Sequence, residues 1–450
     1  RRAPQFAIEW CARQPGASRV LTPPVVLLLQ STGAAGATLR RIMSLLQAHR
    51  EPRGGSSAWD SGRVALPARS TLHRDRECDV LVVGAGVTGA LVAEGLSDIG
   101  LHVITCDRHA PAAGATAASM GMVLHGTDAP LARLARRLRR EDAERLWRRT
   151  FLAVHALRDR VHTLGIEAEL QECQSLCLQG DLLDAAGLRA EAQARARAGF
   201  EVNYLPAVQV QREYGIRGRA ALRSGGALAV NPRLLAAGLL RVAASRGAEL
   251  LVPEDITAVD SGRSGVHATT RSGHRITSRH VVLATGHALF RWVPSRGHRI
   301  VSTWAIATRP QPRRLWPGPD LVREAGSAGL HLRVTADARI LCAGGNEEMA
   351  NAAERDALLP AKALWLQKKL AALLPRVDAH AAQAWCSAFG TMVHGVPVIG
   401  EIPGMPHCHA ILGCGGDGLA FSVVAAQMLR NRLAGAGDAE LDLLGFQRRR

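Results

Sequence analysis

Three glycines follow an apolar stretch near residue 80 at the spacing Gly-x-Gly-x-x-Gly. The stretch is residues 79–83, and the glycines are Gly84, Gly86 and Gly89. Where a strand turns into a helix, the first such glycine permits a tight turn, the second lets the backbone approach a pyrophosphate, and the third lets the helix pack closely on the strand. The N-terminus of the helix then faces the phosphates. The pattern predicts a dinucleotide-binding site.

An acidic residue at the end of the next apolar stretch supports this prediction. Residues 102–106 form that stretch, and Asp107 follows it, about 20 residues after the glycines. A carboxylate at this place accepts hydrogen bonds from a ribose and disfavours the additional 2′-phosphate of NADP. Strand, glycine turn, helix, second strand and terminal acid together indicate a βαβ unit.

The chain is strongly basic, with a formal net charge of +17 over 450 residues. Clustered cationic side chains bind nucleic acids favourably because binding releases the counterions of the phosphates. However, only three of the 56 basic residues are lysine, and aromatic residues, which stack on unpaired bases, make up 4% of the chain. The sequence has no recognisable nucleic-acid-binding motif. We therefore expect no nucleic-acid partner.

The nine cysteines are scattered along the chain. The closest pairs, Cys173 with Cys177 and Cys408 with Cys414, lack the spacing of zinc ligands. We expect reduced thiols, no bound metal and a cytoplasmic location. The apolar run at residues 25–29 is too short to span a bilayer, so we expect no transmembrane segment.

The elements that must position these residues alternate between helical and strand patterns, which indicates an α/β fold. Residues 131–164 carry apolar side chains at helical spacing, and Asn231 with Pro232 predicts the start of a helix that ends at residue 245. The further expected elements are strands at residues 249–252, 256–259, 266–270, 280–284, 300–307 and 331–343 and a helix at about 360–374.

The first residues have a different composition from the rest. Residues 1–42 are rich in arginine, proline and small residues without sustained periodicity. We expect them to be a disordered extension upstream of a natural start at Met43. Residues 43–77 are expected to form a leader to the first strand.

Further stretches resemble one known family. They are Gly114 to Ser119, residues 284–286 (Ala-Thr-Gly), residues 332–345 and the C-terminal block 385–422, which contains the glycine turn 413–418 and leads into a helix. With the βαβ unit, over about residues 60–434, the chain resembles the FAD-dependent oxidoreductases of the D-amino acid oxidase, glycine oxidase and sarcosine oxidase type.

The resemblance implies a Rossmann-like FAD-binding domain, discontinuous in sequence, interleaved with a substrate domain on a large mixed or antiparallel β-sheet. The FAD-binding domain is expected at residues 78–135, 225–292 and 390–434, the substrate domain at 136–224 and 293–389, and a basic tail at 435–450.

The resemblance also implies the chemistry. An amine or amino acid transfers hydride from its α-carbon to flavin N5, which gives an imine that water hydrolyses. Relatives carry a lysine near the flavin that assists oxygen, whereas the three lysines here lie on or beside the expected helix 360–374. The electron acceptor is therefore oxygen or a quinone or carrier. We expect non-covalent FAD, because Cys386 is out of register with the attachment site of relatives.

Candidate site residues come from matching these stretches to the family. His331, Arg333, His394 and Trp385 are expected to line the substrate cavity, and Asp417 is expected to cap the C-terminal helix. The residues expected to bind FAD are Gly84, Gly86, Gly89, Asp107, Arg108, Thr116, Ser119, Val259, Thr285, Gly286, Gly415 and Gly416.

Two other functions remain compatible with the sequence. An NAD-linked dehydrogenase needs the same βαβ unit but leaves the glycine turn 413–418 unexplained. A non-catalytic flavoprotein subunit would bind FAD that no amine or amino acid reduces. A bound yellow chromophore and its bleaching by substrate separate these alternatives.

Overall fold

The structure, a computed structural model, describes residues 53–62, 64–311, 319–326, 329–416 and 418–447. The expected extension 1–42, the start at Met43 and the capping role of Asp417 lie outside the described residues. None of the described helices is both long and apolar enough to cross a membrane.

Eight strands of the described chain form a sheet around β2, which runs parallel to its neighbours β11 and β3. The glycine turn follows the C-terminal end of β2. The members in sheet order are β17 (Val398–Glu401), β18 (Cys408–Leu412), β11 (Arg275–Leu283), β2 (Arg76–Val83), β3 (Val103–Cys106) and β8 (Glu249–Leu251), with β10 (Gly265–Thr270) on β11 and β9 (Ile256–Gly262) on β10.

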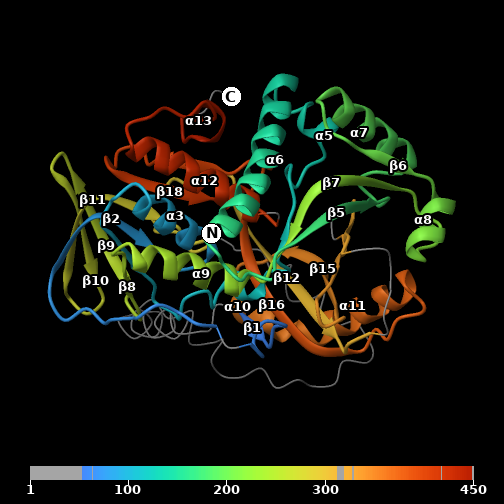
Figure 1. Cartoon of the computed structure of the whole chain (residues 1–450), viewed down its shortest axis with the longest axis horizontal. Helices are drawn as coiled ribbons and strands as arrows, with labels where there is room; N and C mark the ends of the chain where they lie inside the picture. The colour runs from blue at the N-terminus through green and yellow to red at the C-terminus, as the bar shows by residue number, and fades with distance from the viewer. Residues whose placement is uncertain (1–52, 63, 312–318, 327–328, 417, 448–450) are drawn as a thin grey trace, which may run out of the picture. The chain divides into compact units, whose positions relative to one another are not determined.

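β2 is apolar on both faces because both faces are covered. Val80 and Val82 pack in the cluster of helices α3 (Val87–Ser97), α9 (Pro232–Ser245) and α12 (Gly418–Leu433), whereas Leu81 and Val83 pack in the cluster that includes β9 and β10. Successive strand residues point to opposite faces, so a continuous apolar run suits a covered parallel strand. Figure 1 shows α3, α9 and α12 beside this sheet.

The helix predicted from Asn231 and Pro232 is confirmed as α9. The Asn231 side chain accepts hydrogen bonds from the N–H groups of Arg233 (3.2 Å) and Leu234 (3.3 Å). Pro232 occupies the first turn, where its missing N–H costs nothing. These two residues fix where the helix begins.

A second, ten-stranded sheet contains both parallel and antiparallel pairs among the described strands. The expected α/β class with a large mixed sheet is confirmed. The members in sheet order are β1 (Gly54–Gly55), β16 (Ala381–Met392), β12 (His298–Thr308), β15 (Ile340–Glu348), β14 (His331–Val334), β13 (Leu321–Glu324), β5 (Gln171–Leu178), β7 (Ala221–Ala229) and β4 (Met122–Val123), with β6 (Asn203–Leu205) paired to β7.

The two faces of this sheet have different neighbours. On one face, Trp304, Leu332 and Cys342 pack with residues of α11 (Leu359–Leu373), the helix expected at 360–374. On the other face, Ala343 and Trp385 pack with residues of the segment that follows β3. This second face therefore lies against the chain between β3 and β4.

Two sequence expectations are refined. The helical stretch 131–164 contains two helices, and the strand stretch 331–343 is divided between β14 and β15. The domain boundaries drawn from the sequence stay a prediction. The other described helices are α4 (Ala115–Ala118), α5 (Leu131–Leu134), α6 (Arg140–Thr163), α7 (Ala185–Arg197), α8 (Ala207–Tyr214), α10 (Ala352–Ala357) and α13 (Leu441–Leu444).

Candidate functional site

The β2–α3 turn has the geometry expected of a phosphate-binding turn. Gly84 has φ +113°, and a Cβ there would lie 2.5 Å from the carbonyl oxygen of Ala284 at the end of β11. A Cβ at Gly89 would overlap the Gly84 carbonyl oxygen. Only glycine at these two positions lets α3 begin directly behind β2. The turn is a cradle of the kind that receives a phosphate at a helix N-terminus.

Thr116 contacts the N-terminus of α3. Its buried Oγ1 accepts a hydrogen bond from the N–H of Val87 (2.9 Å), the first residue of the helix. A Cβ at Gly86 would lie 3.1 Å from the same oxygen. Gly86 and Thr116 are therefore brought together, as the sequence prediction of a shared site requires.

Asp107 ties the turn to the end of β3. Its Oδ2 accepts from the N–H of Ala85 (2.7 Å), and its Oδ1 accepts from the N–H of His109 (2.8 Å). Burial raises the pKa of Asp107, although the N–H groups of His109 and Ala85 act in the opposite direction. A carboxylate offers about four acceptor positions, so two remain for ribose hydroxyls. The exposed Arg108 follows it.

Two indoles hold the segment that contains Ser119. The Nε1 of Trp59 donates to Ser119 O (2.8 Å), and the Nε1 of Trp385 donates to Ala118 O (2.9 Å). Ser119 Oγ accepts from the N–H of Gly121 (3.1 Å). Trp385 is 1% exposed. Its position in β16 therefore joins the ten-stranded sheet to the segment beside the glycine turn.

Arg333 holds the next residues of this segment. Its Nη1 donates to the carbonyl oxygens of Met120 (3.0 Å), Gly121 (3.0 Å) and Val230 (2.8 Å). Burial lowers the pKa of Arg333 to about 10. A guanidinium used in this way positions the backbone around residue 121, and its role in the substrate cavity stays a prediction.

The two candidate histidines lie in different elements. His331 is half-buried in β14, opposite Ala343 of β15, on the same face of the strand as Arg333. His394 lies in the connection between β16 and β17, where its Nδ1 accepts from the N–H of Val396 (3.3 Å). Their catalytic assignment stays a prediction.

The C-terminal glycine turn lies beside β16. The N–H of Gly415 donates to Gly390 O (3.0 Å), and the backbone of Gly415 has φ +78°. A Cβ at Gly416 would lie 3.8 Å from the ring of Phe389. The turn leads into α12, so the positive end of that helix lies behind the two glycines.

The remaining predicted FAD residues lie on the eight-stranded sheet or shortly after one of its strands. Val259 is buried in β9, which pairs with β10 and, among the described strands, with no other. Thr285 and Gly286 follow β11. The Oγ1 of Thr285 donates to the carbonyl oxygen of Ala288, and Gly286 is exposed with φ +65°. Their contact with a nucleotide stays a prediction.

Sequence reasoning missed Ser387, which lies between Trp385 and Phe389 on the same face of β16. The side chain is 3% exposed, and its Oγ has no hydrogen-bond partner among the described residues. Because a buried unpaired hydroxyl costs about 1–3 kcal/mol, this atom is where a bound ligand could add a hydrogen bond. The position follows from strand alternation, but the missing partner is visible only in the structure.

Cys386 points to the opposite face from Ser387. Its Sγ donates to Asp356 Oδ1 (3.3 Å), and burial raises the pKa of the thiol to about 11. The strand therefore directs this thiol toward α10 and away from the face that carries Trp385.

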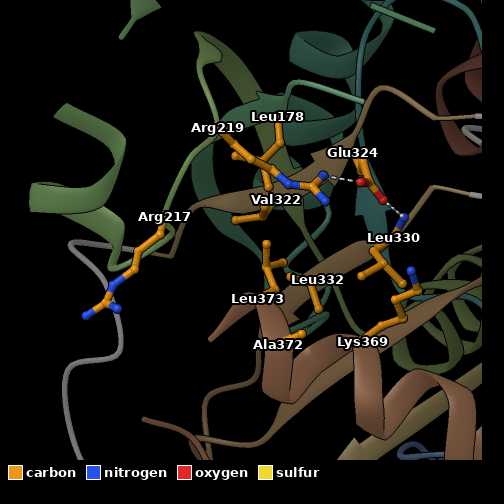
Figure 2. A pocket seen from close by; sticks show the side chains of 10 residues that line it. All are labelled: Leu178, Arg217, Arg219, Val322, Glu324, Leu330, Leu332, Lys369, Ala372 and Leu373. Carbon is orange, nitrogen blue, oxygen red and sulfur yellow. Dashed lines mark hydrogen bonds and ion pairs between the residues drawn. The ribbon is translucent and has the colours of Figure 1, made fainter. Parts of the chain in front are cut away.

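A pocket of about 270 Å³ lies on the α11 face of the ten-stranded sheet. Figure 2 shows the Arg219 guanidinium directed at Glu324, with which it forms an ion pair, while Arg217 points away from the other lining residues. Because Leu332 lines this pocket, whereas its neighbours His331 and Arg333 face the other way, the pocket is separate from the candidate site.

The class of protein follows from a comparison with known families. A family model described as "DAO: FAD dependent oxidoreductase" matches residues 79–432. The chain belongs to this DAO family of FAD-dependent oxidoreductases, so it is an enzyme whose cofactor is FAD. No curated sequence matches the chain.

The fold is similar to those of several solved structures. Glycine oxidase from Geobacillus kaustophilus has a TM-score of 0.68 at 20% identity, over 83% of this chain and 100% of that chain. L-amino acid deaminase from Proteus vulgaris has a TM-score of 0.65 at 17% identity, over 84% and 97%. L-proline dehydrogenase from P. horikoshii has a TM-score of 0.63 at 14% identity, over 82% and 97%. These likenesses concern the fold.

The described residues fit this cofactor. The turn at Gly84 and Gly89 suits a pyrophosphate, and the two remaining acceptor positions of Asp107 suit a ribose. The dipole of helix α12, which begins behind Gly415, suits an anionic ring edge. No group of three metal-ligating side chains occurs in the part of the chain that the structure describes.

Proposed function

We propose that this enzyme oxidises a C–N bond of an amine or an amino acid. When bound, FAD would supply the hydride acceptor: flavin N5 would take a hydride from the substrate α-carbon, a proton would leave the nitrogen, and water would hydrolyse the resulting imine. The protein contributes by binding and orienting the substrate and by excluding competing reactions.

The observation that carries this proposal is the match of residues 79–432 to the family of FAD-dependent oxidoreductases. The structure adds a candidate substrate contact, the buried hydroxyl of Ser387. It lies between Trp385 and Phe389 on the sheet face that packs against Ala118 and Met120, and the ring of Phe389 lies next to Gly416. A polar substrate group bound there would pair with this oxygen, and its apolar part would contact Phe389.

The printed names of structural neighbours support the substrate class. Glycine oxidase, L-amino acid deaminase and L-proline dehydrogenase are each named for an amino acid or for amino acids. All three share the fold of this chain.

Named residues have separate roles in the proposal. Arg333 positions the backbone at residues 120 and 121, and His331 and His394 border the substrate. Flavin attachment is non-covalent, because Cys386 faces α10. The electron acceptor is oxygen or a quinone or carrier, the location is cytoplasmic, and no nucleic acid takes part.

The test is anaerobic reduction of the purified holoenzyme. The visible spectrum is recorded before and after addition of amines, D-amino acids and L-amino acids in separate cuvettes. We expect one compound to bleach the flavin absorption and an imine-derived carbonyl product to appear. Flavin that no compound bleaches would instead support a non-catalytic flavoprotein. Protein that cannot be loaded with FAD would exclude the assignment.

A further inference from the structure

The carboxylate of Asp128 lies directly on the glycine turn that precedes α12. A Cβ at Gly415 would overlap Asp128 Oδ2 and would lie 2.9 Å from Cγ and 3.0 Å from Oδ1. A Cβ at Gly416 would lie 3.9 Å from Oδ1. The carboxylate therefore fills the space that a side chain at Gly415 would take.

Two segments that border the proposed flavin site meet at this contact. Asp128 lies in the connection from β4 to α5, a short distance after Gly121, whose carbonyl oxygen accepts from Arg333. Gly415 lies between β18 and α12 and is fixed to β16 through Gly390. Asp128 is also exposed.

The glycine turn opens α12, a helix of 16 residues. The N-terminus of such a helix carries a partial positive charge that favours an anion in front of it. The N-terminus of α12 favours two anions: the carboxylate of Asp128, and the N1–C2=O edge of an isoalloxazine ring once the ring is reduced. Negative charges within a few ångströms of each other repel.

We propose that Asp128 lowers the reduction potential of the bound flavin and weakens the binding of anions to its oxidised form. This rests on the proposed position of the flavin at Gly415 and Gly416. Solvent and salt screen an exposed carboxylate, so the expected effect of removing its charge is about tenfold rather than several thousandfold.

The test compares the holoenzyme with Asp128→Asn, which removes the charge and keeps an oxygen acceptor. Sulfite, an anion that binds oxidised flavin and bleaches its absorption, is titrated into each protein, and the midpoint potential is measured with reference dyes. We expect Asp128→Asn to bind sulfite about tenfold more tightly. We expect its potential to be higher by about 30 mV, the two-electron equivalent of a tenfold change.

Three further variants separate the effect of the Asp128 charge from the effect of a change in structure. Asp128→Glu keeps the charge and should remain near the wild type. Asp128→Ser gives a second neutral variant in case the asparagine protein does not fold. Asp378→Asn removes an exposed carboxylate that contacts His380 and should change neither quantity. The Asp128→Asn difference should shrink from low salt to 1 M salt, because screening increases.

The outcomes are distinct. Tighter sulfite binding with a higher potential in both neutral variants supports the inference. Neutral variants that carry a full complement of FAD but have wild-type sulfite affinity and potential overturn it and leave the proposed function intact. Wild-type protein that cannot be loaded with FAD overturns the proposed function itself.

Discussion

Glu191 and Arg195 form an ion pair in the protein interior, with Oε1 and Nε 2.7 Å apart. The Glu191 carboxylate also accepts hydrogen bonds from the N–H groups of Leu131 (2.9 Å) and Ala132 (2.8 Å), the first residues of α5. Both side chains of the pair are at least 97% buried. Glu191 in α7 therefore fixes the N-terminus of α5.

Glu191→Gln should lower the free energy of unfolding by about 3 kcal/mol, because it leaves the Arg195 charge buried without its partner. Urea denaturation measures this change. Glu348→Gln breaks an ion pair with Arg299 in which both side chains are at least half exposed, and it should cost less than about 1 kcal/mol. Equal losses in the two variants would contradict the argument.

The two glycines of α3 should respond in opposite directions to alanine. Gly89→Ala places a methyl group on the Gly84 carbonyl oxygen, so we expect a loss of about 3 kcal/mol and a weaker affinity for FAD by at least about tenfold. At Gly95 the nearest atom is 4.0 Å from the added Cβ, and alanine should stabilise the helix by about 0.5–1 kcal/mol. Melting temperature and flavin content after gel filtration measure both effects.

Arg333→Met should disturb the backbone at residues 120 and 121 without removing bulk from the sheet. Three carbonyl oxygens lose their shared donor, and we expect a loss of about 2–4 kcal/mol in stability together with weaker FAD binding. Arg339→Met breaks an ion pair with the largely exposed Asp337 and should cost less than about 1 kcal/mol. Flavin fluorescence released by dilution measures the affinity. Unchanged retention of FAD by Arg333→Met would rule out the positioning role.

Ser387→Ala should separate ligand binding from stability. Removal of a buried hydroxyl without a partner should stabilise the protein by about 1 kcal/mol. The same substitution at Ser278, another buried hydroxyl without a partner among the described residues, should have the same effect on stability. Only Ser387→Ala should lower kcat/KM, by about tenfold, for a compound that reduces the flavin. A loss of equal size in Ser278→Ala would show that position on the β16 face does not matter.

His409 should make stability depend on pH. It is buried in β18, and burial together with the neighbouring His280 lowers its pKa to about 4 from an ordinary 6.5. Between these values the unfolded chain binds more protons than the folded one, so stability is greatest above pH 6.5 and falls toward pH 4. One such histidine lowers the free energy of unfolding by about 2 kcal/mol when the pH falls from 7.5 to 5.

His409→Gln should reduce this acid dependence by about 2 kcal/mol over the same range. Urea midpoints at pH 7.5, 6 and 5 provide the measurement. The variant should still lose some stability toward low pH, because burial also lowers the pKa values of His125 and His287 to about 4. Parallel curves for the variant and the wild type would refute the assignment to His409.

The sequence predicted those parts of the site that local patterns define. The turn at Gly84 and the start of α9 at Asn231 depend on residues only a few positions apart, so their physical requirements are visible in the sequence. The division between β14 and β15 was not predicted. It depends on a turn in which Ala338 adopts φ +63°, a conformation that alanine seldom shows.

The rest of the site depends on contacts between distant residues. Asp128 meets Gly415, and Trp385 meets Ala118, across more than 250 positions of sequence. No local pattern indicates which carboxylate will lie on a glycine turn. Similarly, Arg333 was expected in the substrate cavity, but its contacts with carbonyl oxygens become visible only once β14 is placed beside residues 120 and 121.

Trp59 sets a practical limit on how the protein can be shortened. The family match begins at residue 79, but Trp59 is 6% exposed, donates to Ser119 O and, through its own carbonyl oxygen, accepts from Arg233 (2.9 Å). A recombinant fragment trimmed to the family boundaries would lose this indole and expose the apolar cluster that contains Trp385. Expression boundaries for this enzyme therefore belong upstream of residue 53.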